Sequence, residues 1–244
     1  MKLKTFLLLA VVALSASGAT AQGLNQEQQS EVRELIREHL VENPEILEEA
    51  FEALQGRQQA VAAQARQDAI AELGNALRHA GDDPIGGNPE GKITVVEFFD
   101  YNCPFCRRVK PEVMELLESD DRIRYVFKEF PILSASSAQA ARVALAIWAL
   151  APTAYWDAHN ALMAHDGTLT EDDIRAVVVD AGLDWDEVAA RGDEDDITEK
   201  IRQTLEIAQR LQINGTPSFV IGDEIIPGFV EAEQLEAAVA AIDG

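Results

Sequence analysis

The order of apolar runs in the last two thirds of the chain constrains the fold most strongly. Residues 93–99 are apolar apart from Thr94 and Glu97, which predicts a strand covered on both faces. Residues 109–117 follow with helical spacing of their apolar side chains, and residues 122–130 predict a second strand. A strand, a helix and a strand in this order predict a βαβ unit with a parallel strand pair.

A long helical segment separates this unit from a second pair of strands. Apolar side chains recur with helical spacing over about residues 134–212. Gly222-Asp223 then lies between two short apolar runs, 218–221 and 224–226, which predicts a hairpin, and residues 231–242 predict a closing helix. We therefore predict an α/β fold made of a βαβ half, a helical insertion and a ββα half.

The start of this α/β domain is predicted from polar and turn-forming residues. The stretch Asp82-Asp83-Pro84 stands among three glycines and predicts a linker or turn. We therefore place the domain at residues 81–244 and a separate N-terminal helical region at residues 22–80.

The first residues of the chain have the pattern of a secretory signal peptide. Lys2 and Lys4 precede an apolar run over residues 6–14, and small residues follow up to Ala19-Thr20-Ala21. An uncleaved transmembrane anchor is the alternative, but a membrane span needs roughly 20 apolar residues. We predict removal of residues 1–21, no transmembrane anchor and, in a bacterium, a periplasmic location.

Residues 22–80 predict two helices, and the second is long and polar with a narrow apolar stripe. Asn25 is the predicted N-cap of the first helix, and Asn43-Pro44 ends it and starts the second. Gly56 and Gly74 predict a break or hinge in the second helix, since each costs about 1 kcal/mol relative to alanine. The stripe needs a partner, either the chain's own domain or the same helix of another subunit. We expect self-association, because the predicted domain looks complete without this region.

The charge of the chain argues against polyanionic partners. The net charge is −23, and removal of the two lysines near the N-terminus makes it more negative still. Nucleic acids and anionic lipids bind basic patches, so neither is an expected partner. Most of this charge is interpreted as a contribution to solubility.

Both cysteines lie in one motif, Cys103-Pro104-Phe105-Cys106. A structural disulfide is disfavoured, because stabilisation grows with the length of the closed loop and this loop is very short. Zinc needs about four cysteine or histidine ligands, and the four histidines show no metal-ligand spacing. These are His39, His79, His159 and His165. The motif therefore predicts a redox pair, with no bound metal or cofactor.

The position of the pair after a strand and at the start of a helix indicates which sulfur reacts. Free backbone N–H groups and the helix dipole favour a thiolate at Cys103 and lower its pKa below the free value of about 8.5. Cys103 is then the exposed nucleophile, and Cys106, one turn inside the helix, forms or resolves the disulfide. A thiolate of this kind exchanges disulfides through a mixed-disulfide intermediate.

Two motifs together resemble a known family. The segment 97–106, EFFDYNCPFC, and the segment 215–219, GTPSF, are similar to the DsbA-like branch of the thioredoxin-fold disulfide oxidoreductases. The helical insertion matches too, so the resemblance covers residues 83–244. Residues 25–29 and 42–47 further resemble the suppressor-of-copper-sensitivity C (ScsC) subgroup, which implies oligomerisation through the N-terminal helices and disulfide isomerase activity.

The resemblance implies roles for residues outside the cysteine pair. Thr216-Pro217 is expected to contain a cis peptide bond that places the Thr216 backbone beside the cysteines, where it pairs with a substrate strand. An ordinary turn before the hairpin is the alternative. Glu97 is expected to lie beneath the cysteines and assist proton transfer to the buried sulfur, unless it lies on a partly exposed strand face. Arg124 or Lys128 is the expected partner of Glu97.

The residues between the cysteines depart from the pattern of strongly oxidising relatives. Those relatives carry histidine where this chain has Phe105, which offers no donor or charge. We therefore expect a less stabilised thiolate and a less oxidising disulfide than in those relatives. Pro104 and Phe105 join Thr216 and Pro217 as candidate substrate-binding residues.

The expected function is a periplasmic thiol:disulfide oxidoreductase, favoured as an oligomeric isomerase or reductase. Its expected partners are cysteine-containing exported proteins, a membrane or periplasmic redox partner, and further copies of the chain. One alternative is a monomeric oxidase of exported proteins. The other is a non-enzymatic chaperone or a copper-binding protein that uses the two cysteines as soft ligands.

Overall fold

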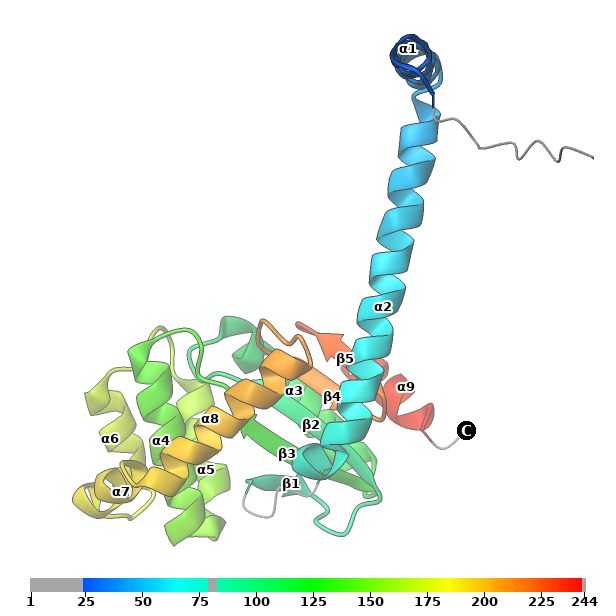
Figure 1. The fold of residues 1–244 in the computed structure, drawn as a ribbon. Coiled ribbons are helices and arrows are strands. Elements are labelled where there is room, and N and C mark those ends of the chain that lie inside the picture. Colours follow the sequence, from blue (N-terminus) through cyan, green and yellow to red (C-terminus); the bar gives the residue numbers. More distant parts are fainter. Residues whose placement is uncertain (1–23, 79–82, 243–244) are drawn as a thin grey trace, which may run out of the picture. The chain divides into compact units, whose positions relative to one another are not determined.

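The computed structural model describes residues 24–78 and 83–242 (Figure 1). The predicted signal peptide, residues 1–21, lies outside the described residues. Contacts between Cα atoms divide the chain into two compact units, Met1–Gln58 and Gln59–Gly244. Within the described ranges, no helix combines the length and the apolar character needed to cross a membrane.

The first unit contains α1 (Gln26–Glu42) and the start of α2 (Glu45–Arg78). The predicted cap of α1 is confirmed, because Asn25 Oδ1 accepts from the Gln28 N–H at 2.9 Å and Gln28 Oε1 accepts from the Asn25 N–H at 3.1 Å. The predicted break in α2 is wrong, since this helix runs without interruption through both of its glycines. A glycine that costs about 1 kcal/mol weakens a helix without ending it.

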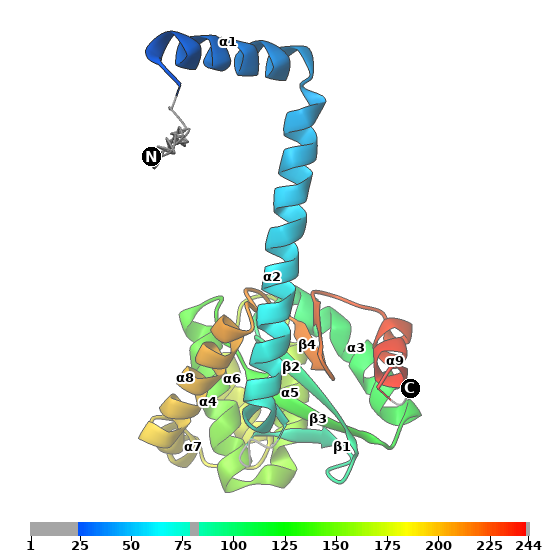
Figure 2. The same ribbon diagram turned by 45° about the vertical axis from the view of Figure 1, so that its right-hand side comes forward.

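The second unit is built on a five-stranded sheet in the order β1-β3-β2-β4-β5 (Figure 2). Its long central strands pair in parallel, from Ile93 opposite Ile123 to Phe99 opposite Glu129, which confirms the predicted βαβ unit. The predicted hairpin is confirmed too, because β4 pairs antiparallel with β5 as well as with β2. The strands are β1 (Ile85–Gly87), β2 (Ile93–Phe99), β3 (Ile123–Glu129), β4 (Ser218–Ile221) and β5 (Glu224–Pro227).

Strand β1 lies in the stretch predicted to be a linker or turn. It pairs antiparallel with β3, and Asp83 just before it is buried in ion pairs with Lys128 and, at 3.1 Å, with Lys200. Residues Ile85–Gly87 are therefore a strand and not part of a linker, whereas Asp83 and Pro84 lie outside helices and strands. A three-residue edge strand with two glycines shows no alternation of apolar side chains, and only its long-range pairing reveals it.

Helices cover both faces of the sheet in the second unit (Figures 1 and 2). Helices α3 and α9 and much of the insertion share a core cluster with Val95, Phe99, Tyr125 and Phe127 on one face. The ends of α2 and α8 pack on the opposite face. The predicted helical insertion is confirmed by α4–α8. The helices are α3 (Pro104–Ser119), α4 (Ala135–Leu150), α5 (Pro152–Ala164), α6 (Glu171–Asp180), α7 (Trp185–Gly192), α8 (Asp195–Arg210) and α9 (Ala232–Ala240).

The C-terminal part of α2 belongs to the core of the second unit. Ile70, Leu73 and Leu77 are 1%, 8% and 1% exposed and share a cluster with Phe98 and Val126 of the sheet. This part of the apolar stripe is covered by the chain's own domain, so its expected burial against another subunit is wrong. The division of the chain also falls earlier than the predicted boundary at residue 80, because the α/β domain needs these side chains to cover one face of its sheet.

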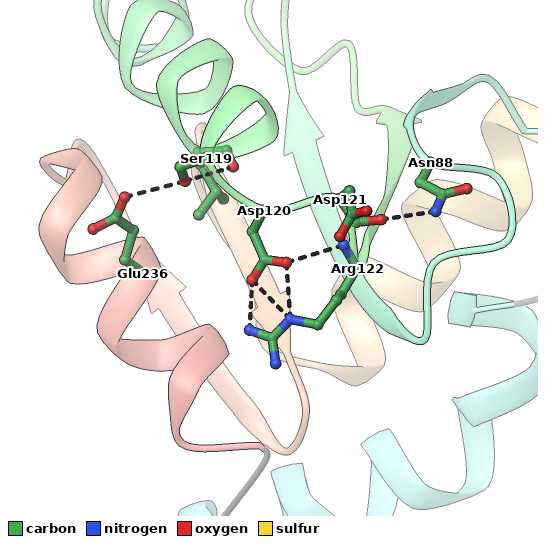
Figure 3. Close-up of polar contacts among 7 residues, drawn as sticks. Asn88, Ser119, Asp120, Asp121, Arg122 and Glu236 are labelled. Atoms are coloured by element: carbon green, nitrogen blue, oxygen red, sulfur yellow. Dashed lines mark hydrogen bonds and ion pairs between the residues drawn. The ribbon is translucent and has the colours of Figure 1, made fainter.

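Polar contacts hold the connection between α3 and β3 (Figure 3). Asp120 accepts from the Arg122 backbone N–H at 2.9 Å and forms an ion pair of 2.6 Å with its guanidinium group. The Asn88 side chain donates to the Asp121 carbonyl at 2.7 Å, and Ser119 Oγ donates to Glu236 of α9 at 3.2 Å. These bonds fix the C-terminal end of the helix that carries the cysteines.

Candidate active site

The two cysteines occupy the first turn of α3. Cys103 is the N-cap with extended backbone angles, Pro104 takes the first helical position, and Cys106 lies one turn inside. Both cysteines are free thiols, with 4% of Cys103 and 1% of Cys106 exposed. The expected exposure of Cys103 is therefore wrong, whereas Phe105 between them is 55% exposed. Cys103 is covered because a loop distant in sequence lies against its sulfur.

That loop contains the predicted cis peptide bond, between Thr216 and Pro217. Cys103 Sγ lies 3.2 Å from the Thr216 carbonyl oxygen, to which the thiol donates. Ser218 Oγ donates to the Gly215 carbonyl at 2.8 Å and holds the loop where β4 begins. Both motifs that suggested the family from sequence thus meet at one sulfur atom.

The electrostatic environment gives the two thiols very different pKa values. A hydrogen bond from the Cys106 thiol is the main cause that lowers the pKa of Cys103 to about 5, against the opposing effect of burial. Hydrogen bonds from the backbone N–H groups of Cys106 and Phe105 lower it further. Burial, followed by the bond to Cys103, raises the pKa of Cys106 far above its ordinary value. At neutral pH the pair therefore consists of a Cys103 thiolate and a Cys106 thiol.

Glu97 of β2 is buried, with 4% of its surface exposed, and its charge acts on Cys106. Tyr125 donates a hydrogen bond of 2.7 Å to Glu97 Oε2. Burial raises the pKa of Glu97 to about 7, the bond from Tyr125 opposes that rise, and the charge of Cys103 adds to it. Glu97 consequently changes its protonation near neutral pH.

The predicted partner of Glu97 is wrong. The parallel register places Glu97 opposite Phe127, so the odd-numbered residues of β2 and β3 share one face of the sheet. Lys128 and Arg124 are even-numbered and lie on the other face, where Lys128 pairs with Asp83 and donates to the Ala76 carbonyl at 3.1 Å. The sequence showed the alternation within each strand but not the register between them.

Asp100 and Asn102, which the sequence analysis did not select, fix the loop that leads into Cys103. Asp100 accepts hydrogen bonds from the backbone of Asn102 at 2.8 Å, Ile132 at 2.9 Å and Leu133 at 3.0 Å. Asn102 Nδ2 lies within hydrogen-bond distance of three serine hydroxyls, and Asn102 Oδ1 accepts from the Leu169 N–H at 2.8 Å. The serines are Ser134, Ser136 and Ser137. A polar pair next to a cysteine motif was the available signal, but its partners are distant in sequence.

A buried cluster of Tyr101, Glu129 and His159 also escaped the sequence analysis. Tyr101 was seen only as part of the family motif, and Glu129 only as the end of a strand. His159 was considered as a metal ligand and instead packs inside the domain, 3% exposed. The signal for Glu129 was an acid on the apolar side of a strand, with the same parity as Tyr125 and Phe127.

Comparison with known domains follows this geometry. A DSBA-like thioredoxin domain matches residues 94–240, and the Copper resistance protein ScsC N-terminal domain matches residues 28–60. The resemblance inferred from the two sequence motifs and the N-terminal helices is confirmed.

Several solved structures are similar over most of the chain. A linker-deletion variant of Proteus mirabilis ScsC has a TM-score of 0.68 at 32% identity and covers 91% of this chain and 98% of its own. BcfH of Salmonella enterica Typhimurium has a TM-score of 0.74 at 32% identity, with coverages of 89% and 97%. The thiol-disulfide exchange protein alpha-DsbA2 of Wolbachia pipientis has a TM-score of 0.69 at 27% identity, with coverages of 74% and 97%.

Curated relatives match roughly two thirds of the chain, 65% in one case and 64% in another. The Na(+)/H(+) antiporter NhaA 1 of Salinispora arenicola is 30% identical over 159 residues, which are 65% of this chain and 24% of that protein. Disulfide bond formation protein D of Bacillus subtilis is 20% identical, over 64% of this chain and 75% of that protein. The chain thus spans 24% of the length of the first two curated relatives. From the domain match and the cysteine geometry, the chain belongs to the DSBA-like thioredoxin domain family, and residues 94–240 form a thiol:disulfide oxidoreductase domain of that family.

Proposed function

We propose that the whole protein is a periplasmic thiol:disulfide oxidoreductase that works as an oligomer in disulfide isomerisation or reduction. The observation that carries this proposal is the Cys103 sulfur at the start of α3, with its pKa lowered to about 5 and the Thr216 carbonyl 3.2 Å away. A thiolate beside a backbone acceptor suits attack on a polypeptide that pairs with the loop as an added strand. Pro104 and Phe105, both exposed, and Pro217 complete the proposed client-binding surface.

The proposed reaction starts from the reduced pair. The Cys103 thiolate attacks one sulfur of a client disulfide, a Cys103–client bond forms, and the other client sulfur leaves as a thiolate. In isomerisation a client thiolate attacks this mixed disulfide and releases Cys103, with no net transfer of electrons. In reduction Cys106 loses its proton and attacks Cys103, so that the Cys103–Cys106 bond forms and the client leaves with both electrons. A separate thiol reductant must then reduce the pair.

Glu97 is the proposed acid and base for Cys106 in the reductive step. Cys106 is a thiol whose pKa is strongly raised, so its attack requires a base nearby. The charge of Glu97 acts on Cys106, and the pKa of Glu97 of about 7 suits both loss and gain of a proton at neutral pH. Glu97 accepts the Cys106 proton in this step and returns it when the pair is reduced again.

The first unit is proposed to mediate self-association. Its two helices expose many large apolar side chains, and such surfaces in a soluble chain mark interaction sites. A second copy of the same helices offers an apolar stripe of matching spacing. The exposed side chains of the two helices are Val32, Leu35, Ile36, Val41, Leu47, Phe51 and Leu54, and Leu24 just before α1 is exposed as well.

Location and clients are proposed from the sequence pattern and from relatives. Residues 1–21 have the pattern of a removable signal peptide, and one similar solved structure is a periplasmic thioredoxin-like protein of Salmonella enterica serovar Typhimurium. The proposed clients are exported proteins with cysteines, and a membrane or periplasmic partner is proposed to keep the pair reduced. No cofactor is needed, because the two sulfurs carry the electrons.

A monomeric oxidase of exported proteins is the second candidate. The observation that favours it is the low pKa of Cys103, because a stabilised thiolate favours the reduced pair and makes the disulfide more oxidising. The chaperone and copper-binding alternatives gain no comparable support from the described residues.

The deciding experiment supplies two clients to the purified mature protein. The pre-reduced protein receives a scrambled multi-disulfide client, and the pre-oxidised protein receives a reduced client. Recovery of the scrambled client, lost both in Cys103→Ser and on deletion of residues 22–58, supports the proposal. The deletion stops at residue 58 because residues beyond it are needed in the core. Rapid oxidation of the reduced client, unaffected by the deletion, favours the oxidase instead.

A further inference from the structure

Tyr101, Glu129 and His159 form a hydrogen-bonded chain inside the oxidoreductase domain. The Tyr101 hydroxyl lies 3.1 Å from Glu129 Oε1 and 3.1 Å from His159 Nδ1. The three residues are 1%, 3% and 3% exposed. Trp156 stacks on the His159 ring at 5.6 Å between centroids, and Phe127 lies 4.8 Å from it. The three side chains are therefore tightly surrounded and shielded from water.

Few hydrogens are available for the two hydrogen bonds that join Tyr101 to Glu129 and to His159. A tyrosine hydroxyl carries one hydrogen, but here it stands between a carboxyl oxygen and an imidazole nitrogen. If Tyr101 donates to His159 Nδ1, Glu129 must be protonated and donate to Tyr101. If Tyr101 donates to Glu129, His159 must carry its hydrogen on Nδ1. The protonation of Glu129 and the tautomer of His159 are thus linked.

The surroundings favour the arrangement in which Glu129 is protonated. Among the described residues, Tyr101 is the one side chain that hydrogen-bonds to Glu129, and no cation pairs with it. A buried carboxylate with a single donor is costly, whereas a neutral carboxylic acid is not. Burial raises the pKa of Glu129 well above its ordinary value, and burial likewise lowers the pKa of His159 to about 3.

The other ionisable groups around Glu129 do not supply a compensating charge. The three that raise the pKa of Glu129 by their own negative charge are Asp100, Asp83 and Glu97. Lys110 of α3 acts on His159 and opposes its protonation. Tyr155 of α5 lies against His159, with 5.8 Å between ring centroids. The negative groups thus disfavour an ionised Glu129, and Lys110 disfavours a protonated His159.

The neutral network of Tyr101, Glu129 and His159 is linked to the reactive sulfur through the backbone at Tyr101. Tyr101 stands two residues before Cys103, and Arg107 of α3 donates to its carbonyl at 3.0 Å. Glu129 also shares a face of the sheet with Glu97, since the register sets Phe99 opposite Glu129 and Phe127 opposite Glu97. An ionised Glu129 would therefore place a second negative charge on the side of the sheet where Glu97 and the cysteines react.

We propose that Glu129 is a positioning residue that works as a neutral carboxylic acid: it donates to Tyr101, Tyr101 donates to His159, and this chain holds the loop that carries Cys103. Glu97 is then the carboxyl beneath the cysteines that titrates during exchange. The inference rests on the proposed function, because it assigns Glu129 a part in the same thiol–disulfide exchange.

The test compares two replacements of Glu129 in the full-length mature protein. Glu129→Gln keeps a donor and cannot ionise, so we expect client reduction within about twofold of wild type and an unchanged pKa of the Cys103 thiolate. Glu129→Leu removes the hydrogen bond, and we expect a loss of about tenfold in kcat/KM. Leu145→Ala, in a separate core cluster, is the matched control for lost stability. If Leu145→Ala loses as much stability as Glu129→Leu, it should still reduce the client at the wild-type rate.

The outcomes separate this inference from the proposed function. A fall of about one unit or more in the thiolate pKa of Glu129→Gln would show that wild-type Glu129 is charged, and would overturn the inference. Equal rates for both replacements, or equal losses in Glu129→Leu and its stability control, would overturn it as well. An inactive wild type would instead overturn the proposed function.

The tautomer of His159 is a readout that does not depend on activity. Nitrogen NMR of the reduced wild-type protein at neutral pH should show Nδ1 without a hydrogen and Nε2 with one. A hydrogen on Nδ1 would mean that Tyr101 donates to an ionised Glu129, which contradicts the proposed chain. The Tyr101→Phe variant, in which neither bond to the hydroxyl exists, assigns the signal.

Discussion

Replacement of Glu97 by glutamine should remove a specific pH dependence from the stability of the reduced protein. Burial raises the pKa of Glu97 to about 7 in the folded chain, whereas an unfolded glutamate has a pKa of about 4.3. The folded state therefore favours the protonated form. The stability that this provides is fully present below the unfolded pKa, and it is lost as the pH rises to the folded pKa. At about 1.36 kcal/mol per pKa unit, the loss is on the order of 3–4 kcal/mol.

The assay is urea unfolding of the reduced wild type and of Glu97→Gln across this interval. Glutamine mimics the protonated acid and still accepts the hydrogen bond from Tyr125, so the two proteins should be similar at low pH. Their difference should then grow in favour of the variant by about 3–4 kcal/mol as the pH rises to about 7. Glu90→Gln, at an exposed carboxyl, is the control and should run parallel to wild type.

The titration of Cys103 is the main complication, and its sign is opposite. Its pKa is lowered in the fold, so its contribution to stability is present at high pH and is lost as the pH falls through about 5. It occurs in both proteins and largely cancels in their difference. A difference between wild type and Glu97→Gln that stays constant from about pH 4 to about pH 7 would refute a buried carboxyl of high pKa at this position.

Three further predictions concern the thiolate, the core and the first unit. The far-ultraviolet absorbance of the thiolate should titrate with a midpoint near pH 5 in wild type and be lost in Cys103→Ser. A midpoint near the free value of about 8.5 would contradict the environment described for Cys103. Ile70→Ala should lower the free energy of unfolding by about 2–5 kcal/mol, because it empties a core site. Val179→Ala, at a side chain 57% exposed, should change it by about 0.5 kcal/mol or less. Leu35→Lys should lower the mass in solution towards that of a monomer and leave reduction of a small disulfide intact, and an unchanged mass would count against self-association through α1.

Local patterns were sufficient to predict most of the elements and the reactive pair. The period of the apolar side chains predicted β2, α3, β3, the hairpin and the insertion, because each signal lies within a single element. The cap at Asn25 and the position of Cys103 before a helix were readable for the same reason. Strand β1 and the continuity of α2 were not predicted, because they depend on pairing and packing with residues far along the chain.

The sequence by itself determined the chemistry of the site, and the tertiary structure decided how that chemistry is controlled. The spacing of Cys103 and Cys106 and the Thr216-Pro217 motif were enough to identify a redox pair and its family. The burial of Cys103, the bond from Tyr125 to Glu97 and the chain through Glu129 followed only from the fold. Each depends on the register of neighbouring strands or on a loop from the other end of the domain. The pKa of a buried group is set by such distant neighbours, which no local pattern records.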